Sequence, residues 1–283
     1  MNVAAPTGGR DVPRRRRWPP RLIAGSAIIA IGIVTALLSL AWTPEPPIQI
    51  RIALRLKPPL VAGLLGTDAL GRDVLSLLML GAWNSLTIAF SAILLGCLFG
   101  TALGLLAAAR RGWLDEPIMR VGDVIFAFPA LISAIVIGAL IGPGRLTAIL
   151  AIGIFSMPVF ARVARNAALQ IWAQGYVLAA LALGRSRGGV ALGHVLPNIA
   201  GTVAVQLSIQ LGLAILVEAG LSFLGLGLPP PAPSWGRMLA DAQTYFGQAP
   251  WLALAPGGAI AFAVLGFTLL GDGLRDLLDP RSR

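Results

Sequence analysis

The sequence contains few side chains that could carry out chemistry together. It has one histidine, His194, and one cysteine, Cys97. A metal centre needs several histidine, cysteine or acidic ligands at defined spacings, such as H-E-x-x-H, and no such pattern occurs. The phosphate-binding pattern G-x-x-x-x-G-K-[ST] is also absent, and the glycine-rich stretch GLGLPPP (Gly225–Pro231) lacks a lysine. We therefore expect no catalytic residues, no metal and no cofactor in this chain.

Three polar residues, Glu218, Ser222 and Asp123, lie within or beside long apolar segments. An ionised acid at the centre of a bilayer costs roughly 2.5–3.5 kcal/mol, so such a residue usually faces other protein groups or water. Glu218 and Ser222 are candidates for lining or gating a pathway. The alternative is a structural hydrogen bond from Glu218 to the turn that follows it. Asp123 is either a pathway residue or a charge stabilised by a helix N-terminus.

The composition indicates the kind of element that must position these residues. Of the 283 residues, 57% are hydrophobic and only 12% are charged, and the mean hydropathy is +0.82. Soluble domains carry about 25% charged residues, so lipid is the expected solvent for much of the surface. The net charge of +10 resides at the ends of apolar runs. This distribution is typical of membrane topology and does not indicate nucleic-acid binding.

The sequence predicts an all-α membrane protein with six transmembrane helices, since six apolar runs reach about 18 residues or more. Prolines at positions 129 and 158 should kink the third and fourth helices. The GPGR turn between these two helices predicts an antiparallel pair. The predicted spans are Leu22–Trp42, Ser85–Ala109, Val121–Ile141, Leu146–Ala164, Ile199–Leu221 and Trp251–Leu270.

The distribution of basic residues predicts the orientation of these spans. With the N-terminus inside, the inner segments hold sixteen of the 22 lysines and arginines, and the outer segments hold six. Cytoplasmic segments carry an excess of such residues, so both termini and Gln174–Gly193 are predicted to be cytoplasmic. A seventh span at Tyr176–Leu183 would move the C-terminal arginines outside.

The stretch Tyr176–Leu183 is apolar but too short to cross a membrane. Eight helical residues rise about 12 Å, whereas the hydrocarbon core is about 30 Å thick. A short apolar helix in a cytoplasmic loop needs a cover. Three covers are open: the membrane interface, a groove on a partner protein, or the chain's own bundle.

Several motifs in one order resemble the permeases of ABC importers for dipeptides and oligopeptides, specifically the shorter of the two permease subunits. The resemblance runs from about Gly66 to Arg281. The motifs are GTDALGRDVLS from Gly66, AFPAL from Ala127, AALALG…HVLPN from Ala179, EAGLSFLGLGLPPPAPSWGRML from Glu218, APWLALAPG from Ala249 and LLGDGLRDLLDPR from Leu269.

The resemblance implies a type I ABC importer permease fold in a prokaryotic cytoplasmic (inner) membrane. It also implies four kinds of partner: a second homologous permease subunit, two cytoplasmic ATP-binding subunits, an extracytoplasmic solute-binding protein and the lipid membrane, but no nucleic acid. Relatives of this kind import dipeptides, oligopeptides, glutathione, nickel chelates or haem. The alternative to an importer permease is a secondary transporter or channel subunit driven by an ion gradient, which predicts more intramembrane charges or paired broken helices.

In such permeases the cytoplasmic loop, here about residues 171–194, docks a short helix into the ATPase. The implied coupling residues of the Tyr176–Asn198 loop are Tyr176, Ala179, Ala180, Leu181, Gly184, His194, Pro197 and Asn198. Gly184 is predicted to end the helix in a left-handed conformation. Pro197 fits the first turn of the next span, with His194 and Asn198 supplying capping hydrogen bonds. Leu178 and Leu181 stand where relatives carry charges, which predicts a more apolar contact.

The expected layout combines these predictions. Proline-rich sequence before Asp73 argues against one long helix in the outer segment. Asp73–Trp83 is expected to form an amphipathic helix on the membrane surface, where it meets the binding protein or rims the pathway entrance. In chain order we expect a disordered basic tail (1–21), a first helix (22–42), an extracytoplasmic segment (43–83), a five-helix permease core (84–273) and a cytoplasmic tail (274–283).

Overall fold

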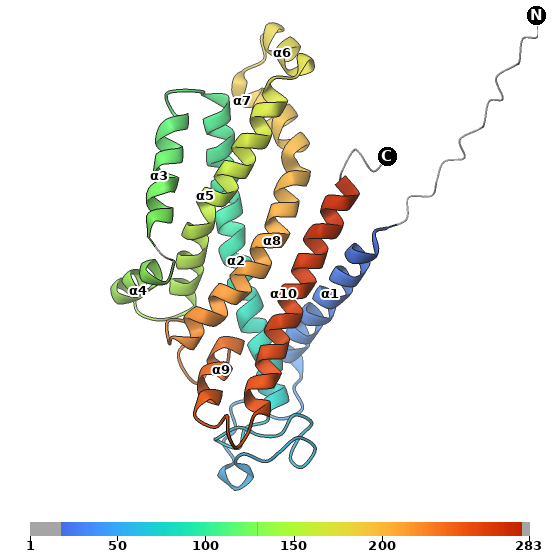
Figure 1. Cartoon of the computed structure of the whole chain (residues 1–283), viewed down its shortest axis with the longest axis vertical. Coiled ribbons are helices and arrows are strands. Elements are labelled where there is room, and N and C mark those ends of the chain that lie inside the picture. The colour runs from blue at the N-terminus through green and yellow to red at the C-terminus, as the bar shows by residue number, and fades with distance from the viewer. Residues whose placement is uncertain (1–17, 129, 279–283) are drawn as a thin grey trace, which may run out of the picture.

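The computed structural model describes residues 18–128 and 130–278, and these form an elongated bundle of helices (Figure 1). The expected tail at 1–17 and the end of the second tail at 279–283 lie outside the described residues. The elements are α1 Pro20–Ala41, η1 Ile52–Leu54, α2 Val74–Ala109, α3 Asp115–Ala127, α4 Ala130–Ile141, α5 Arg145–Trp172, α6 Gly175–Ala182, α7 Arg187–Val190, the π-helical turn η2 Ala191–Val195, α8 Leu196–Phe223, α9 Trp235–Gln243 and α10 Trp251–Leu278.

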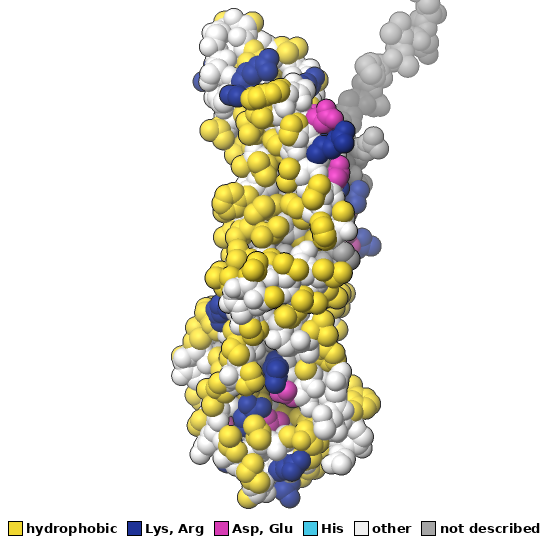
Figure 2. Space-filling model, turned by 90° about the vertical axis from the view of Figure 1, so that its left-hand side faces the viewer, with side chains coloured by type: hydrophobic (Ala, Val, Ile, Leu, Met, Phe, Trp, Pro, Cys, Tyr) yellow, Lys and Arg dark blue, Asp and Glu magenta, His cyan; other side chains and the backbone are white. Residues whose placement is uncertain are grey.

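The described residues include five helical segments long and apolar enough to cross a membrane, or six if α3 and α4 count as one span. Their outward faces carry large exposed apolar side chains, as lipid requires. On the face drawn in Figure 2, hydrophobic side chains cover most of the middle of the molecule. Charged side chains gather mainly toward its two ends. The expectation of an all-α membrane protein is confirmed.

Two predicted spans differ from the structure. The second span was expected to begin at Ser85, after a surface helix over Asp73–Trp83, but α2 begins at Val74 and runs unbroken for 36 residues. The boundary expected between residues 83 and 84 therefore falls inside α2. Hydropathy misses these first turns because their cover is protein: Val74, Leu77 and Met79 are buried.

The third predicted span is not one kinked helix. The axes of α3 and α4 differ by 89°, and the break falls where the sequence places Pro129, a residue outside the described set. Figure 1 shows α4 lying across the direction of the other long helices. The remaining spans were placed correctly, although α5, α8 and α10 extend several residues beyond their predicted ends.

Helices α2 and α5 run side by side in the same direction and form the central seam of the bundle. Glycines at positions 96, 100 and 104 recur every four residues along one face of α2, where α5 comes close to the backbone. A Cβ added at Gly100 would lie 2.7 Å from the Cβ of Phe160, which is fully buried. Small residues at this spacing allow membrane helices to pack closely without a hydrophobic driving force.

The bundle has two distinct ends. The α6 end holds α6 and α7, and Figure 1 shows the start of α1 and the end of α10 nearer to it. Leu22 of α1 packs against Gly273 of α10 there. The α9 end holds α9, the 42–73 segment and the 224–234 loop. The start of α1 and the end of α10 therefore lie toward the same end as α6, as the predicted topology requires.

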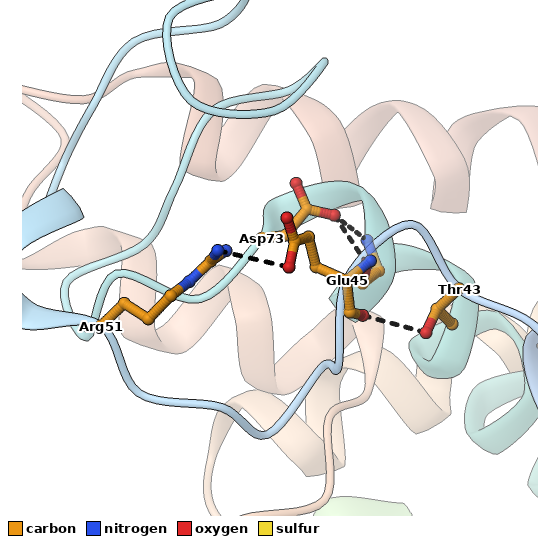
Figure 3. A network of polar contacts seen from close by, with 5 residues as sticks. Thr43, Glu45, Arg51 and Asp73 are labelled. Carbon is orange, nitrogen blue, oxygen red and sulfur yellow. Dashed lines mark hydrogen bonds and ion pairs between the residues drawn. The ribbon is translucent and has the colours of Figure 1, made fainter.

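A polar network fixes the 42–73 segment to the start of α2 (Figure 3). Asp73 caps α2 by accepting hydrogen bonds from the Ser76 backbone N–H at 2.8 Å and from the Ser76 hydroxyl at 2.7 Å. The Ser76 hydroxyl in turn accepts from the Glu45 N–H at 3.0 Å. Glu45 pairs with Arg51 at 3.2 Å, and its carbonyl accepts from the Thr43 hydroxyl. The chain leaving α1 is thus anchored to α2.

The α2–α5 seam predicts that Gly100→Ala destabilises the protein. The added methyl group would overlap α5, and overpacking of this kind costs about 1–3 kcal/mol. The matched control is Gly258→Ala in α10, where no atom lies within 4 Å of the added Cβ. Alanine is a better helix former than glycine, so the control should be neutral or stabilising. Thermal unfolding in detergent measures both, and equal midpoints would contradict the seam.

Candidate functional site

The short helix α6 packs on its own bundle through only part of its surface. Val177 is fully buried against a cluster that includes Trp172, Val190 and Val195. Tyr176, Leu178 and Leu183 remain exposed, and Leu183 is 87% exposed. The chain's own bundle therefore covers one side of α6 and leaves an apolar side open. The predicted coupling residues Ala179 and Gly184 are exposed too, while Ala180 and Leu181 are half-buried.

The C-terminus of α6 closes with a Schellman motif. Gly184 has φ +85°, its N–H donates to the Leu181 carbonyl at 3.0 Å, and the Arg185 N–H donates to the Ala180 carbonyl at 3.1 Å. No other atom lies within 4 Å of the position that a Cβ would take at Gly184. The predicted left-handed helix end is confirmed, and the need for glycine there comes from the backbone angle and not from crowding.

The helix after this turn begins earlier than predicted. Ser186 caps α7 by accepting from the Gly189 N–H at 3.2 Å, and residues 187–223 run on as one helical segment. Pro197 is the second residue of α8 and lies in its first turn, as predicted, although α7 and η2 extend the helical segment on the N-terminal side of it. The π-helical turn η2 precedes Pro197, where the ordinary helical hydrogen-bond pattern would need the N–H that proline lacks.

Both His194 and Asn198 make side-chain hydrogen bonds near the start of α8, as predicted, but neither side chain accepts a backbone N–H as an N-cap does. The Asn198 side chain donates to the His194 carbonyl at 2.6 Å, within the helix. The His194 ring lies 3.3 Å from an Arg185 nitrogen and packs edge-on against Tyr176 of α6. The imidazole thus joins the α6 turn to η2. Sequence reasoning missed the cap at Ser186. Serine is a common N-cap residue, and its hydroxyl typically accepts from the backbone N–H two or three residues later.

Two arginines brace the α6 end, one by a hydrogen bond and one by an ion pair. Arg187 donates to the Ala109 carbonyl at 3.0 Å and so closes the end of α2. Arg165 of α5 makes a two-pronged ion pair with Asp115 at the start of α3. Planar guanidinium–carboxylate pairs of this kind fix geometry as well as adding energy. The α2–α3 turn, α5 and the α6 loop are held as one unit.

Asp123 pairs with Arg162 of α5 and not with its neighbour Arg120, which pairs with Glu116 at 2.9 Å. It lies well inside α3, whose first turn holds Asp115 and Glu116. The prediction that Asp123 is a charge at a helix N-terminus is therefore wrong. Asp123 is exposed on the α3–α5 face, and its role in a pathway stays a prediction.

Glu218 and Ser222 lie together in the interior near the α9 end. Glu218 is fully buried, and its Oε1 accepts from the Ser222 hydroxyl at 2.6 Å. Ser85 on α2 and Ser234 at the start of α9 lie close to this carboxyl group, but its Oε2 makes no hydrogen bond within the described residues. Each of these two serines accepts a backbone N–H, from Trp235 and Arg237 respectively, which leaves its own hydrogen free to donate to the carboxyl group. The hydrogen bond to the LSFLG turn is thus present.

Around this carboxyl group, side chains distant in sequence hold α9 against the bundle. Asn84 donates to the Pro233 carbonyl at 2.7 Å and accepts from Arg145 at 2.7 Å. The Trp235 indole donates to the Leu78 carbonyl at 3.1 Å. Sequence reasoning missed Asn84, Arg145 and all of α9. The polar pair Asn84–Ser85 directly before an apolar run could have indicated contacts with another part of the protein.

Within the described residues, no group of three or more His, Cys, Asp or Glu side chains is arranged to hold a metal ion. The arrangement contains two features suited to function. One is an exposed apolar helix on a braced turn at the α6 end. The other is a buried carboxyl group at the junction of α2, α8 and α9.

Comparison with known proteins shows which family the chain belongs to. The family model described as "Binding-protein-dependent transport system inner membrane component" matches residues 100–283. The dipeptide transport system permease protein DppC of Alkalihalophilus pseudofirmus is 38% identical over 261 residues, which cover 92% of this chain and 86% of DppC. The glutathione transport system permease protein GsiD of Pectobacterium atrosepticum is 43% identical over 225 residues, covering 80% of this chain and 75% of GsiD.

The fold has a counterpart among solved structures. The inward-facing MetNI methionine ABC transporter aligns with a TM-score of 0.61 at 20% identity, covering 72% of this chain and 97% of that chain. An identity this low shows the fold alone. The family match and the two permeases that align over most of this chain show more. The chain belongs to the binding-protein-dependent transport system inner membrane components, and it is a multi-pass permease subunit of an ABC importer with the type I fold.

Proposed function

We propose that this permease imports dipeptides or longer peptides and that α6 couples it to a cytoplasmic ATPase. The observation that carries the coupling role is the open apolar side of α6, which ends in a turn whose backbone is fixed by hydrogen bonds and which lies at the end of the bundle braced by the Arg165–Asp115 ion pair. A short apolar helix with one side left open suits a groove on a partner. The peptide class is supported by the dipeptide and glutathione permeases among the relatives.

The partners follow from this role. The chain forms half of the pathway with a second, homologous permease, and an extracytoplasmic binding protein delivers the substrate. ATP hydrolysis belongs to two cytoplasmic ATP-binding subunits, since this sequence lacks a phosphate-binding loop with its lysine. The permease itself is a non-catalytic transport subunit. Ligand binding by the purified cognate binding protein tests the peptide class, and selective binding of a nickel chelate or haem would overturn it.

The α6 end faces the cytoplasm in this proposal. The basic residues near it, among them Arg185 and Arg187, fit the excess of positive charge on cytoplasmic segments. We expect Gly188→Cys, in a Cys97→Ala background, to react with an impermeant thiol reagent only from the cytoplasmic side. Gly188 has open space around it. Val61→Cys at the α9 end is the matched control and should react only from outside. External labelling at position 188 would contradict the orientation.

We expect Gly184→Val to uncouple ATP hydrolysis from transport. A β-branched residue at φ +85° is strained by about 1–2 kcal/mol, and relief of that strain would re-aim Tyr176 and Leu183. Membrane insertion and pairing with the second permease should persist, because the spans pack elsewhere. The matched control is Gly175→Val at the start of α6, where space is open and φ is not positive.

Co-purification of the ATPase and substrate-stimulated ATP hydrolysis in reconstituted vesicles measure the effect. The coupling role predicts weaker docking and lost stimulation for Gly184→Val. Normal docking with normal stimulation would show that α6 is not the coupling element.

We also propose that Glu218 shapes or gates the pathway near the α9 end, together with Ser222. The support is the position of the carboxyl group, where α8 meets both α2 and the start of α9. Glu218→Gln keeps the shape and the hydrogen-bonding capacity but removes the ionisable group. We expect transport to fall by roughly tenfold, equivalent to about 1.4 kcal/mol, with assembly unchanged. Transport equal to that of the parent across a range of pH would count against an ionised gate.

A further inference from the structure

Three charged residues form a stripe along one face of α3. Glu116, Arg120 and Asp123 follow one another at spacings of four and three residues, which place side chains on the same face of a helix. All three are exposed, whereas Gly122, on another face of α3, is buried against Pro158 of α5. Figure 1 shows α3 on the side of the bundle away from α1 and α10. The charged stripe is thus an outer surface of the chain along the edge between α3 and α5.

The far end of this stripe lies deep in the membrane layer. Trp113, just before α3, is 78% exposed, and tryptophan is enriched where a span meets the lipid headgroups. Helix α3 starts at Asp115 and rises from there, so Asp123 lies about 12 Å further along its axis. The hydrocarbon layer is about 30 Å thick in total. A side chain as short as that of aspartate does not reach back to the headgroups over this distance.

Lipid is a poor cover for charged groups at this depth. Asp123 pairs with Arg162 of α5, and the exposed fractions of the two side chains are 65% and 39%. Charged side chains within membrane spans are costly, and they face either other protein groups or a water-filled cavity. The stripe of charged residues continues from Asp123 to the α6 end, where water is present. We therefore expect water to follow the stripe from that end as far as the Arg162–Asp123 pair.

The Arg162–Asp123 pair keeps hydrogen-bonding groups in reserve. Its contact joins only Nη2 of Arg162 to Oδ1 of Asp123. Within the described residues, the other guanidinium nitrogens of Arg162 and Oδ2 of Asp123 make no hydrogen bond. The neighbouring Arg165–Asp115 pair is two-pronged and less exposed, at 26% and 16% of the two side chains. The inner pair thus fixes the helices to each other, whereas the outer pair has donors and an acceptor free for a ligand.

The chemistry of the outer pair selects a ligand with charges of both signs. The guanidinium carbon of Arg162 lies 4.7 Å from the centroid of the Phe126 ring, and this stacking orients the guanidinium plane. A ligand carboxylate can accept hydrogen bonds from that guanidinium, and a ligand ammonium group can donate to the Asp123 carboxylate. A zwitterion therefore exchanges one internal ion pair for two external ones. A ligand with a single charge leaves one protein charge without compensation.

We propose that Arg162, Asp123 and Phe126 form a binding subsite for the two charged ends of a short zwitterionic peptide that moves toward the α6 end. The inference rests on the proposed function and deepens it, because it assigns recognition of the peptide to residues of this chain. Exchange of one ion pair for two similar ones gives weak binding, as passage through a pathway requires. Helix α4, which continues the chain beyond α3, carries no charged residue, so the pair ends the charged surface.

Binding of the dipeptide alanylalanine to the assembled importer in lipid nanodiscs, without the binding protein, tests the subsite. Saturation-transfer NMR detects weak binding of this kind. We expect Asp123→Asn and Arg162→Gln each to lower the affinity at least about tenfold, since each removes a charge-assisted hydrogen bond. Asp241→Asn in α9, which removes a similarly exposed ion pair with Arg237, is the matched control and should bind like the parent. Parental affinity in both subsite variants would overturn the proposal.

Blocked peptides test the role of each charge separately. N-acetylated alanylalanine lacks the ammonium group, and the C-terminal amide lacks the carboxylate. The parent should bind each at least about tenfold more weakly than the free dipeptide. Asp123→Asn should no longer distinguish the acetylated peptide from the free one, and Arg162→Gln should no longer distinguish the amide. A purely structural role for the pair predicts no such change in selectivity, and equal parental affinity for all three peptides would overturn the subsite.

Access of water to the subsite is the second requirement. We expect Asp123→Cys, in a Cys97→Ala background, to react with an impermeant thiol reagent in inside-out membrane vesicles. Leu265→Cys, at a half-exposed leucine of α10, is the control and should not react, because lipid covers that surface. A lack of reaction at position 123 would show that lipid or the second permease covers the pair, and it would overturn the subsite.

The subsite and the proposed function fail in different ways. If the parent importer transports peptides but its binding of alanylalanine ignores both subsite variants, the subsite alone is wrong. If the parent importer, supplied with its binding protein, transports no peptide, the proposed function is wrong and the subsite with it.

Discussion

The whole structure depends on one requirement of the hydrocarbon layer: every backbone N–H and C=O within it must be paired inside the protein. Helices satisfy this requirement along the middle of the bundle, and the glycine face of α2 lets two of them share one seam. Irregular backbone is consequently confined to the two ends and to the α3–α4 break. The surfaces available for partners lie at those ends, far apart on opposite sides of the same rigid middle.

Hydropathy predicted the spans well because it measures what lipid selects. It failed where protein and not lipid covers the helix: the first turn of α2, with Val74 and Leu77, is buried inside the protein and was not predicted as part of the span. It also failed at α9, a short amphipathic helix that is attached through hydrogen bonds between Asn84 and Pro233 and between Ser85 and Trp235, pairs about 150 positions apart. No local pattern encodes such a contact. Gly184 was predictable for the opposite reason, since a helix end with φ above zero is a local requirement.

Both ends of the bundle have a turn with a left-handed backbone residue, but the residue at that position differs. Each presents exposed apolar side chains on a turn whose backbone is fixed. At the α6 end a glycine takes the left-handed position without strain, and Arg187 and Arg165 brace the surroundings. At the α9 end Leu60 takes a similar position at a cost of about 1–2 kcal/mol, which the Thr67 hydrogen bonds help to offset. The strained choice keeps a large side chain where glycine would offer none.

The unbroken helical segment over residues 187–223 connects these ends mechanically. Its 37 residues form a rod of about 55 Å, with Arg187 at one tip and Ser222, bonded to Glu218, near the other. The π-helical turn η2 interrupts the ordinary hydrogen-bond ladder of this rod beside Pro197, close to the α6 end. A displacement of α6 and α7 along the chain must therefore pass through η2 before it can reach the carboxyl group of Glu218.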